Sequence, residues 1–234
     1  MLPFPVSVFV VAFLIILIVL LMRPRRFYLV RHGETILNAK HIRQGESGGL
    51  SENGKHQAEK VGEALKPLHI KRIISSPYQR TRETTTILNK YLNVTTAYSP
   101  LLAERRNPKE IIEKSADDPE VIHIVDEMDL AYHKDDFRIS DEENFVDLKK
   151  RAQKCLHMLA RQGAGATVVV THHHFLKMLL AYLLYRKRLH AGDFAKLSFF
   201  NTANNAGVTT CEYHPWKRFS KTHGWEVLNF NQQY

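Results

Sequence analysis

Cysteine is scarce in this sequence of 234 residues, which contains only Cys155 and Cys211, far apart in the chain. Their spacing fits neither a metal site nor a redox motif, so we interpret them as reduced thiols in a reducing compartment. Internal repeats, low-complexity tracts, zinc-finger spacings, RNP-like aromatic motifs and basic helices are also missing. We therefore assign the formal net charge of +9 to an anionic membrane surface or substrate, and expect no nucleic-acid partner.

Charged side chains are absent from the first 22 residues, MLPFPVSVFVVAFLIILIVLLM. A helix of roughly 17–20 apolar residues reaches about 25–30 Å, enough to cross a bilayer core. We therefore expect residues 1–22 to form an uncleaved transmembrane anchor. The alternatives are a buried helix or a cleaved signal peptide, but the segment has no basic N-terminus and no small-residue cleavage site. The basic residues 23–26 then form a juxtamembrane linker, and their charge places a catalytic domain, residues 27–234, in the cytoplasm.

Strand-like and helix-like segments alternate after residue 26. This alternation predicts an α/β fold, a three-layer sandwich with a mostly parallel central sheet flanked by helices. The expected strands cover residues 27–30, 71–75, 95–99 and 163–171, with late strands in 199–213 and 225–230. The expected helices cover residues 50–68, 77–92 and 143–162, with a helical insertion within 108–140.

Reactive side chains follow three of the expected strands. Arg31 and His32 end the first, Ser76 and Arg80 follow the second, and His172 ends the run TVVVT. Ligands of parallel sheets gather beyond the carboxyl ends of the strands, so we expect these residues to converge. Because guanidinium groups match phosphate oxygens in a bidentate way, paired arginines point to a phosphoryl substrate.

The motifs LVRHGETILN, SSPYQRTRET and VVVTHHH together resemble those of the histidine phosphatase superfamily, the phosphoglycerate-mutase-like group. The resemblance covers nearly all of residues 27–231 and implies metal-independent phosphoryl transfer through a phosphohistidine, with no cofactor. Carried over position by position, it implies the following roles: His32 is the nucleophile, Arg31, Arg80 and His172 bind the phosphoryl oxygens, Asn38 and Gln44 line the pocket, and Glu104 is the proton donor.

Two segments depart from the family's pattern. The resemblance leads one to expect Gly-Gly after His172, but this chain has His173 and His174, and it has Lys177 where an arginine is frequent. After Glu104, residues 105–108 replace the expected G-x-W-E-G. These differences concern the substrate pocket, so they affect specificity and leave the phosphoryl site complete.

The three consecutive histidines allow more than one interpretation. Alternate side chains of an extended chain face opposite ways, so His172 and His174 can share a side while His173 points away. Three sequential histidines do not easily form one tetrahedral site, although a two-histidine metal site with distant ligands stays an alternative. We interpret His172 as catalytic, and His173 and His174 as substrate contacts or rim residues at the start of the next helix.

These observations favour a membrane-tethered phosphomonoester hydrolase that acts on a phosphorylated small molecule or a phosphoprotein. A mutase that returns the phosphoryl group to another hydroxyl is the alternative within this chemistry. Mutases of the family carry E-R-H-Y-G at the proton donor, and only Glu104 and Arg105 match here. A non-catalytic module that binds a phosphorylated ligand is the alternative from a different class.

Overall fold

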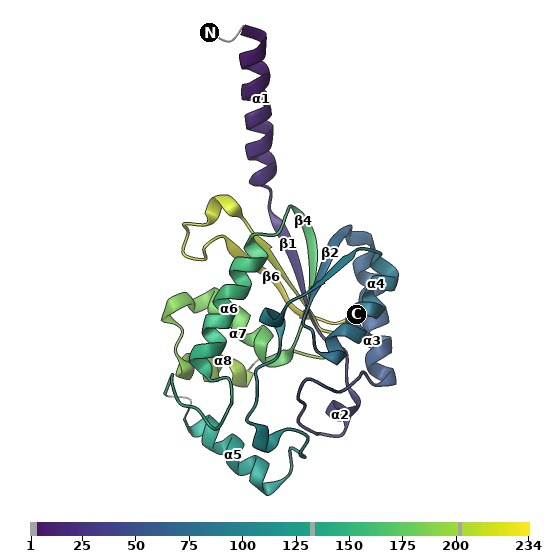
Figure 1. The fold of residues 1–234 in the computed structure, drawn as a ribbon, viewed down its shortest axis with the longest axis vertical. Coiled ribbons are helices and arrows are strands. Elements are labelled where there is room, and N and C mark those ends of the chain that lie inside the picture. Colours follow the sequence, from purple (N-terminus) through teal and green to yellow (C-terminus); the bar gives the residue numbers. More distant parts are fainter. Residues whose placement is uncertain (1–3, 132–133, 201–202) are drawn as a thin grey trace.

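A six-stranded sheet forms the centre of the computed structural model, which describes residues 4–131, 134–200 and 203–234 (Figure 1). The strands lie in the order β3-β2-β4-β1-β5-β6. Their bounds are β1 Arg25–Arg31, β2 Ile70–Ser75, β3 Thr95–Tyr98, β4 Gly165–Thr171, β5 Val208–Tyr213 and β6 Trp225–Gln232.

Parallel pairing holds together the part of the sheet that carries the predicted motifs. Strand β4 lies between β1 and β2 and is parallel to both, and β2 also pairs in parallel with β3. Strands β5 and β6 add an antiparallel edge next to β1. The predicted α/β class with a mostly parallel sheet is therefore confirmed. The strand expected from residue 199 begins only at Val208, because the chain up to Phe200 belongs to helix α8.

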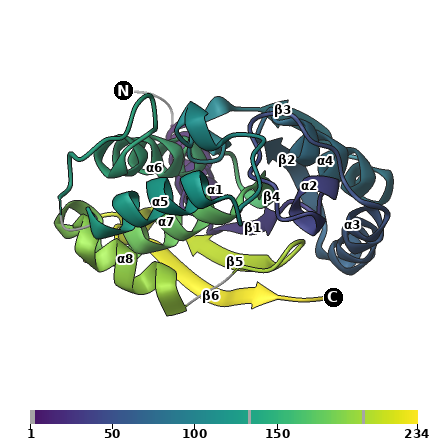
Figure 2. The ribbon, with the colours of Figure 1, turned by 90° about the horizontal axis from the view of Figure 1, so that it is seen from below.

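Helices cover both faces of the sheet in the three layers that the sequence predicts (Figure 2). Successive residues of a strand point to opposite faces, so β1 divides its side chains between the two layers. Tyr28 and Val30 belong to the cluster that includes residues of α3 and α4, whereas Phe27 and Leu29 pack with residues of α6 and α7. The bounds of these helices are α3 Glu52–Leu65, α4 Gln79–Leu92, α6 Phe145–Ala160 and α7 His173–Tyr185.

Capping side chains determine where two of the helices begin. The Ser51 hydroxyl accepts the backbone N–H of Gly54 and starts α3, and the Asn144 side chain accepts that of Asp147 and starts α6. The insertion within 108–140 contains the three-ten helix η3 and helix α5, as expected. The bounds of the remaining elements used below are α1 Phe4–Leu21, α2 Ile36–Ala39, η3 Lys109–Ile111, α5 Pro119–Leu130, η4 Arg186–Arg188 and α8 Ala191–Phe200.

The predicted transmembrane anchor over residues 1–22 is wrong. Within the described ranges, no helix combines the length and the apolar character that crossing a membrane requires. Helix α1, which covers most of the expected anchor, has 18 residues, at the lower end of the lengths that span a bilayer core. Residues 1–3 lie outside the described part of the chain. The localisation as a single-pass membrane protein is therefore wrong, and the placement of residues 27–234 that depended on this span has lost its basis.

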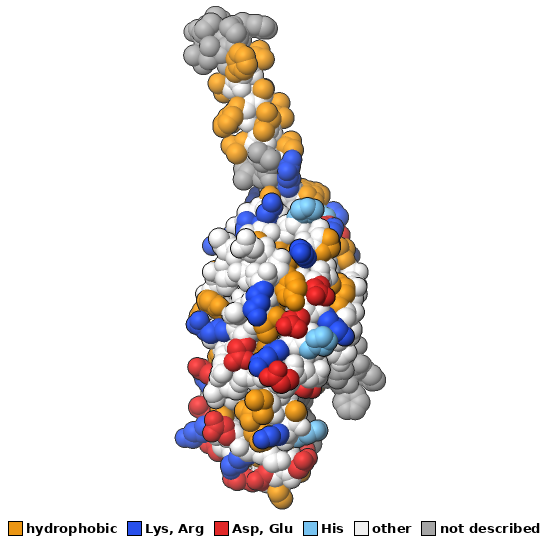
Figure 3. All heavy atoms as spheres, turned by 90° about the vertical axis from the view of Figure 1, so that its right-hand side faces the viewer, with side chains coloured by type: hydrophobic (Ala, Val, Ile, Leu, Met, Phe, Trp, Pro, Cys, Tyr) orange, Lys and Arg blue, Asp and Glu red, His pale blue; other side chains and the backbone are white. Residues whose placement is uncertain are grey.

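Helix α1 extends away from the sheet and its helical layers (Figure 1). Apolar side chains are exposed along it, as Figure 3 shows, and Phe9 is 74% exposed. The short segment after it leads directly into the sheet, since β1 begins at Arg25, inside the expected linker of residues 23–26.

Candidate active site

The carboxyl ends of three parallel strands bring the predicted motifs to one edge of the sheet. Arg31 at the end of β1 is paired with Thr171 at the end of β4, and Ser75 at the end of β2 is paired with Val170. The residues that follow these strand ends are therefore neighbours. The ring centroids of His32 and His172 lie 5.3 Å apart. The structure thus brings together the strand-end residues as the sequence leads us to expect.

His32 is buried, with 3% of its surface exposed. Its Nδ1 lies 2.7 Å from the carbonyl oxygen of Gly33. A carbonyl oxygen can only accept, so Nδ1 carries the proton and Nε2 keeps a free lone pair. Burial lowers the pKa of His32 well below its usual value, and the positive charges of Arg80 and Arg31 lower it further. The imidazole is therefore neutral at neutral pH, the state that a nucleophile requires.

Backbone contacts hold His32 in place. Its N–H donates to the carbonyl oxygen of Thr171 at 3.0 Å, and its own carbonyl accepts from the Asn205 side chain at 3.2 Å. The following glycine is required by space, because a Cβ on Gly33 would lie 2.3 Å from the carbonyl oxygen of Gly54. The motif around His32 is visible in the local sequence, whereas these supporting contacts come from chain segments far away and could not be predicted from it.

Arg80 and Ser76 engage both ring nitrogens of His172. The Arg80 Nε donates to His172 Nδ1 at 3.2 Å, and His172 Nε2 lies 2.7 Å from the Ser76 hydroxyl. Since a guanidinium can only donate, Nδ1 is the acceptor and the proton of the neutral ring is on Nε2. Burial, followed by the charge of Arg80, lowers the pKa of His172 well below its usual value. To bind a phosphoryl oxygen, His172 would have to exchange one of these partners.

Arg31 points into the same site and keeps one donor without a partner. Its Nη1 donates to the carbonyl oxygen of Ala203 at 2.6 Å, while its buried Nε has no hydrogen-bond partner. Burial lowers the pKa of Arg31 to about 10, so the guanidinium remains charged at neutral pH. Arg80 is also almost fully buried, and its Nη1 donates to the carbonyl oxygen of Gly45 at 2.8 Å. Two buried cations beside a neutral imidazole make a site suited to a dianionic phosphoryl group.

Asn38 and Gln44 lie on the segment that Arg80 reaches through Gly45. The side-chain oxygens of both residues are buried and have no hydrogen-bond partner. Buried polar atoms are normally hydrogen-bonded. Two acceptors without donors beside the candidate phosphoryl site are therefore consistent with the pocket wall that we expect there.

Glu104 lies at the N-terminus of α7. Its carboxylate accepts the backbone N–H groups of His174 at 3.2 Å and Phe175 at 2.9 Å, and that of Arg105 at 2.9 Å. The first N–H groups of a helix have no partner within the helix, so a carboxylate is well placed to accept them. This contact puts Glu104 next to the strand end that carries His172.

A further ion pair positions the segment that carries Glu104. The guanidinium of Arg151 donates to both carboxylate oxygens of Glu143, at 2.7 and 2.5 Å, and also to the carbonyl oxygen of Ala103 at 2.7 Å. It also lies 4.1 Å from the ring centroid of Phe175. Arg151 therefore fixes residue 103, and with it Glu104, against the start of α7. This positioning role was visible only in three dimensions.

The residues that depart from the family's pattern surround the phosphoryl site. His173 Nδ1 lies 3.0 Å from the carbonyl oxygen of Ala203, and the His174 ring packs against Phe194 with centroids 5.2 Å apart. Burial lowers the pKa of His173 to about 4, helped by the charges of Arg31 and Lys177. His172, His173 and His174 thus contact three different groups. Among the described residues, no three His, Cys, Asp or Glu side chains are placed to hold a metal ion.

Comparison with known proteins agrees with this arrangement. The family model of the histidine phosphatase superfamily (branch 1) matches residues 27–226. A protein of Enterobacter sp. (strain 638) named "Probable phosphoglycerate mutase GpmB" is 32% identical over 152 residues, which cover 62% of this chain and 68% of that protein. A broad-specificity phosphatase of Saccharomyces cerevisiae is 36% identical over 86 residues, 34% of this chain and 37% of that protein. The match to a protein of Erwinia tasmaniensis named "Probable phosphoglycerate mutase GpmB" covers 36% of that protein's length. With this relative and with the yeast protein, the chain therefore spans little more than a third of the relative's length.

Solved structures share the fold. "Mycobacterial hydrolase 1" has a TM-score of 0.72 and 22% identity, and the match covers 90% of this chain and all of that one. A mycobacterial glucosyl-3-phosphoglycerate phosphatase solved with VO3 has a TM-score of 0.69 and 23% identity, over 89% of this chain and 100% of that one. At these identities the structures support the fold alone. The family match covers most of the chain and contains His32, Arg80 and His172, so this chain belongs to the histidine phosphatase superfamily (branch 1).

Proposed function

We propose that this protein is a phosphomonoester hydrolase that transfers the phosphoryl group of its substrate to Nε2 of His32. The observation that carries this proposal is the hydrogen bond from His32 Nδ1 to the carbonyl oxygen of Gly33, which leaves Nε2 as a lone pair. Arg31 and Arg80 lie close enough to lower the pKa of this imidazole by their charge. The nucleophile is therefore neutral, and the same two cations can bind the group it attacks.

The first half of the reaction forms an N–P bond and breaks a P–O bond. Nε2 of His32 attacks phosphorus, and Arg31 and Arg80 stabilise the charge on the equatorial oxygens. The leaving alkoxide takes a proton from the carboxyl group of Glu104, which lies at the start of α7 next to the strand end that carries His172. His172, neutral and fixed by Arg80 and Ser76, lies beside His32 and binds a phosphoryl oxygen after it exchanges one of these partners. In the second half, the oxygen of a water molecule attacks phosphorus and a proton of the water goes to the Glu104 carboxylate, while the N–P bond breaks and restores neutral His32.

A mutase is the second candidate, because curated relatives carry the name phosphoglycerate mutase. It would return the phosphoryl group to a different hydroxyl of the substrate and not to water. We favour hydrolysis because only Glu104 and Arg105 match the mutase pattern at the proton donor. In this chain Arg105 forms an ion pair with Glu142. Running the reaction in ¹⁸O-labelled water separates the two activities, because only a hydrolase releases labelled phosphate.

Trapping the phosphoenzyme tests the proposal. The full chain, mixed briefly with an aryl phosphate and quenched, should carry phosphate that is labile in acid and stable in alkali, the behaviour of a phosphohistidine. His32→Ala should carry none, while His56→Ala, which removes a histidine that is exposed on α3, should behave as the unmodified chain. Phosphate retained by His32→Ala would refute the assignment of the nucleophile.

The same trap decides between an enzyme and a binding module, and tests the metal alternative. A module that only binds a phosphorylated ligand would give neither turnover nor a phosphoenzyme in the unmodified chain. Chelation by EDTA should leave both unchanged. Loss of activity with EDTA, together with an equal need for His173, His174 and His172, would favour a metal site.

A further inference from the structure

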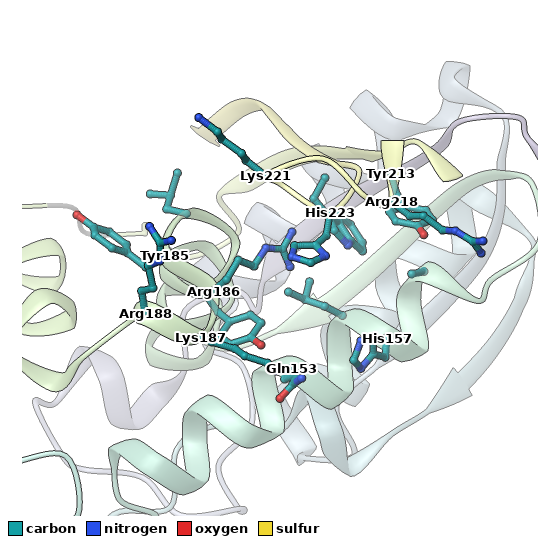
Figure 4. Close-up of a pocket in the computed structure, with 15 residues that line it drawn as sticks. Gln153, His157, Tyr185, Arg186, Lys187, Arg188, Tyr213, Arg218, Lys221 and His223 are labelled. Atoms are coloured by element: carbon teal, nitrogen blue, oxygen red, sulfur yellow. The ribbon is translucent and has the colours of Figure 1, made fainter. Parts of the chain in front are cut away.

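A cavity of about 790 Å³ lies outside the candidate active site (Figure 4). Its walls come from the C-terminal half of α6, from η4 after the end of α7, and from the connection between β5 and β6. Tyr213, which lines it, ends β5 and is paired with Arg25 at the start of β1. The cavity therefore lies near the edge of the sheet where β1 begins, whereas the candidate active site lies where β1 ends.

Positive charge dominates this cavity. No carboxylate of a described residue lines it. Five cationic side chains do, namely Arg186, Lys187, Arg188, Arg218 and Lys221. None of the five forms an ion pair with another residue in the described part of the chain. On the face that carries α3 and α4, in contrast, acidic and basic side chains are interspersed (Figure 3). Positive charges gathered in a cavity attract anions.

Arg186 has two features that a role in stabilising the fold does not explain. Its backbone has φ 54° and ψ −133°, a conformation that residues other than glycine rarely adopt. Its Nε is buried without a hydrogen-bond partner, although the guanidinium donates to the carbonyl oxygen of Thr222. Burial lowers the pKa of Arg186. Figure 4 places its side chain beside His223, with Gln153 and His157 of α6 on the other side. A strained backbone thus holds a half-buried cation whose buried Nε donor is unused.

Lys149 of α6 holds the backbone of η4, which carries three of the five cations. Its ammonium donates to the carbonyl oxygen of Lys187 at 3.0 Å and to that of Leu189 at 2.5 Å. The backbone of residues 186–189, after the end of α7, is therefore fixed by these hydrogen bonds, and so are the positions from which the side chains of Arg186, Lys187 and Arg188 extend.

Aromatic side chains complete the lining. Tyr182, Tyr213 and Trp225 are among the lining residues, and the ring centroids of Tyr213 and Trp225 are 5.1 Å apart. Cavities of this size bind small organic molecules, and a single phosphate ion would fill only part of the space. Two or more phosphate groups would match several separate cations, and an organic body could contact the aromatic rings.

We propose that this cavity is a second ligand site, for a small organic molecule that carries at least two phosphate groups. The cavity is separate from the candidate phosphoryl site. Helix α7 begins at His173, beside His172, and ends at Tyr185, so its 13 residues lie between the two sites and span about 20 Å. The proposal does not depend on the reaction at His32.

Calorimetric titration of the full chain with inorganic tripolyphosphate, and separately with ATP, tests this site. The titration uses a background of Arg31→Gln with Arg80→Gln, so that the phosphoryl site cannot take up the probe. Removal of two cavity cations, Arg186→Gln with Arg218→Gln, should weaken binding by at least about tenfold, since each removes charge-assisted hydrogen bonds. The matched control, Lys60→Gln with Lys90→Gln, removes two exposed charges on α3 and α4 and should change the dissociation constant less than about twofold.

The remaining results would overturn the proposal. Equal weakening in the cavity variant and in the control would mean general charge attraction, and loss of binding in the Arg31→Gln, Arg80→Gln background alone would place the probe at the active site. Urea unfolding checks that each variant folds. If Arg186→Gln does not fold, Arg218→Gln with Lys221→Gln replaces the cavity variant and leaves the strained backbone untouched.

A lipid headgroup has the same phosphate chemistry as a free molecule, so both are compared. Free inositol trisphosphate should bind to the unmodified cavity and lose affinity in the cavity variant. Phosphatidylcholine vesicles containing phosphatidylinositol bisphosphate are the second arm. Binding to these vesicles, with no binding of any free phosphate compound, would refute a site for a small molecule.

Discussion

Acid should destabilise this protein through its buried neutral histidines. His32 and His172 are 3% and 0% exposed, and burial with nearby arginines lowers the pKa of both well below the usual value of 6.5. The unfolded chain takes up a proton at each near pH 6.5, and the native protein does not. The unfolded state therefore binds more protons as the pH falls, so the free energy of unfolding must fall below pH 6.5 and is fully retained above it.

The size of this effect follows from the two pKa values. Between pH 7.5 and 5.5, each histidine that stays neutral in the native state and titrates at 6.5 when unfolded lowers the unfolding free energy by about 1.4 kcal/mol. The two histidines together contribute about 3 kcal/mol, a large share of a typical stability of about 5–15 kcal/mol. Other groups add their own dependence, so the comparison must be made between variants.

Urea unfolding at pH 7.5 and at pH 5.5 measures this contribution. His172→Gln removes one of the two groups, so its unfolding free energy should fall by about 1.4 kcal/mol less than that of the unmodified chain over this pH range. His56→Gln removes an exposed histidine on α3 and should reproduce the unmodified chain's pH dependence. If His172→Gln also has the unmodified dependence, then His172 is charged in the native state and the assignment of its ring nitrogens is wrong.

Three further predictions concern residues around the site. Glu104→Gln should slow turnover of alkyl phosphates far more than that of nitrophenyl phosphate, because nitrophenolate leaves without a proton; equal losses on both substrates would exclude Glu104 as the donor. Glu143→Gln should lower the unfolding free energy by about 1–3 kcal/mol and turnover by about tenfold, because the bidentate pair with Arg151 is lost; urea unfolding and steady-state kinetics measure both, and unchanged turnover would show that the pair does not position Glu104. Cys155 and Cys211 are buried and burial raises the pKa of each to about 12, so Ellman's reagent should react with them only after unfolding, and fast reaction in the native state would contradict their burial.

Local patterns were enough to predict the layered fold. Apolar spacing identified α6, whose buried residues include Leu148, Ala152 and Leu156, and the run TVVVT identified the central strand β4. Both signals are local, because a helix or strand buries residues at its own period. The α/β alternation then implies a parallel sheet, whose carboxyl ends must meet at one edge.

The prediction of the membrane span rested on composition alone. The uncharged, apolar run of residues 1–22 resembles an anchor, but no helix in the described part of the chain is both long and apolar enough to cross a membrane.

The sequence by itself determined which reactive residues end the strands, and it predicted that Arg31, His32, Arg80 and His172 converge. Only the tertiary structure decided what each side chain contacts. Arg80 donates to His172 across 92 positions of the chain, and Glu104 accepts from Phe175 across 71. Such contacts depend on how whole helices and strands pack, and no local pattern encodes them. The cationic cavity has the same origin, because α6, η4 and the β5–β6 connection are separate in sequence and meet only when the chain folds.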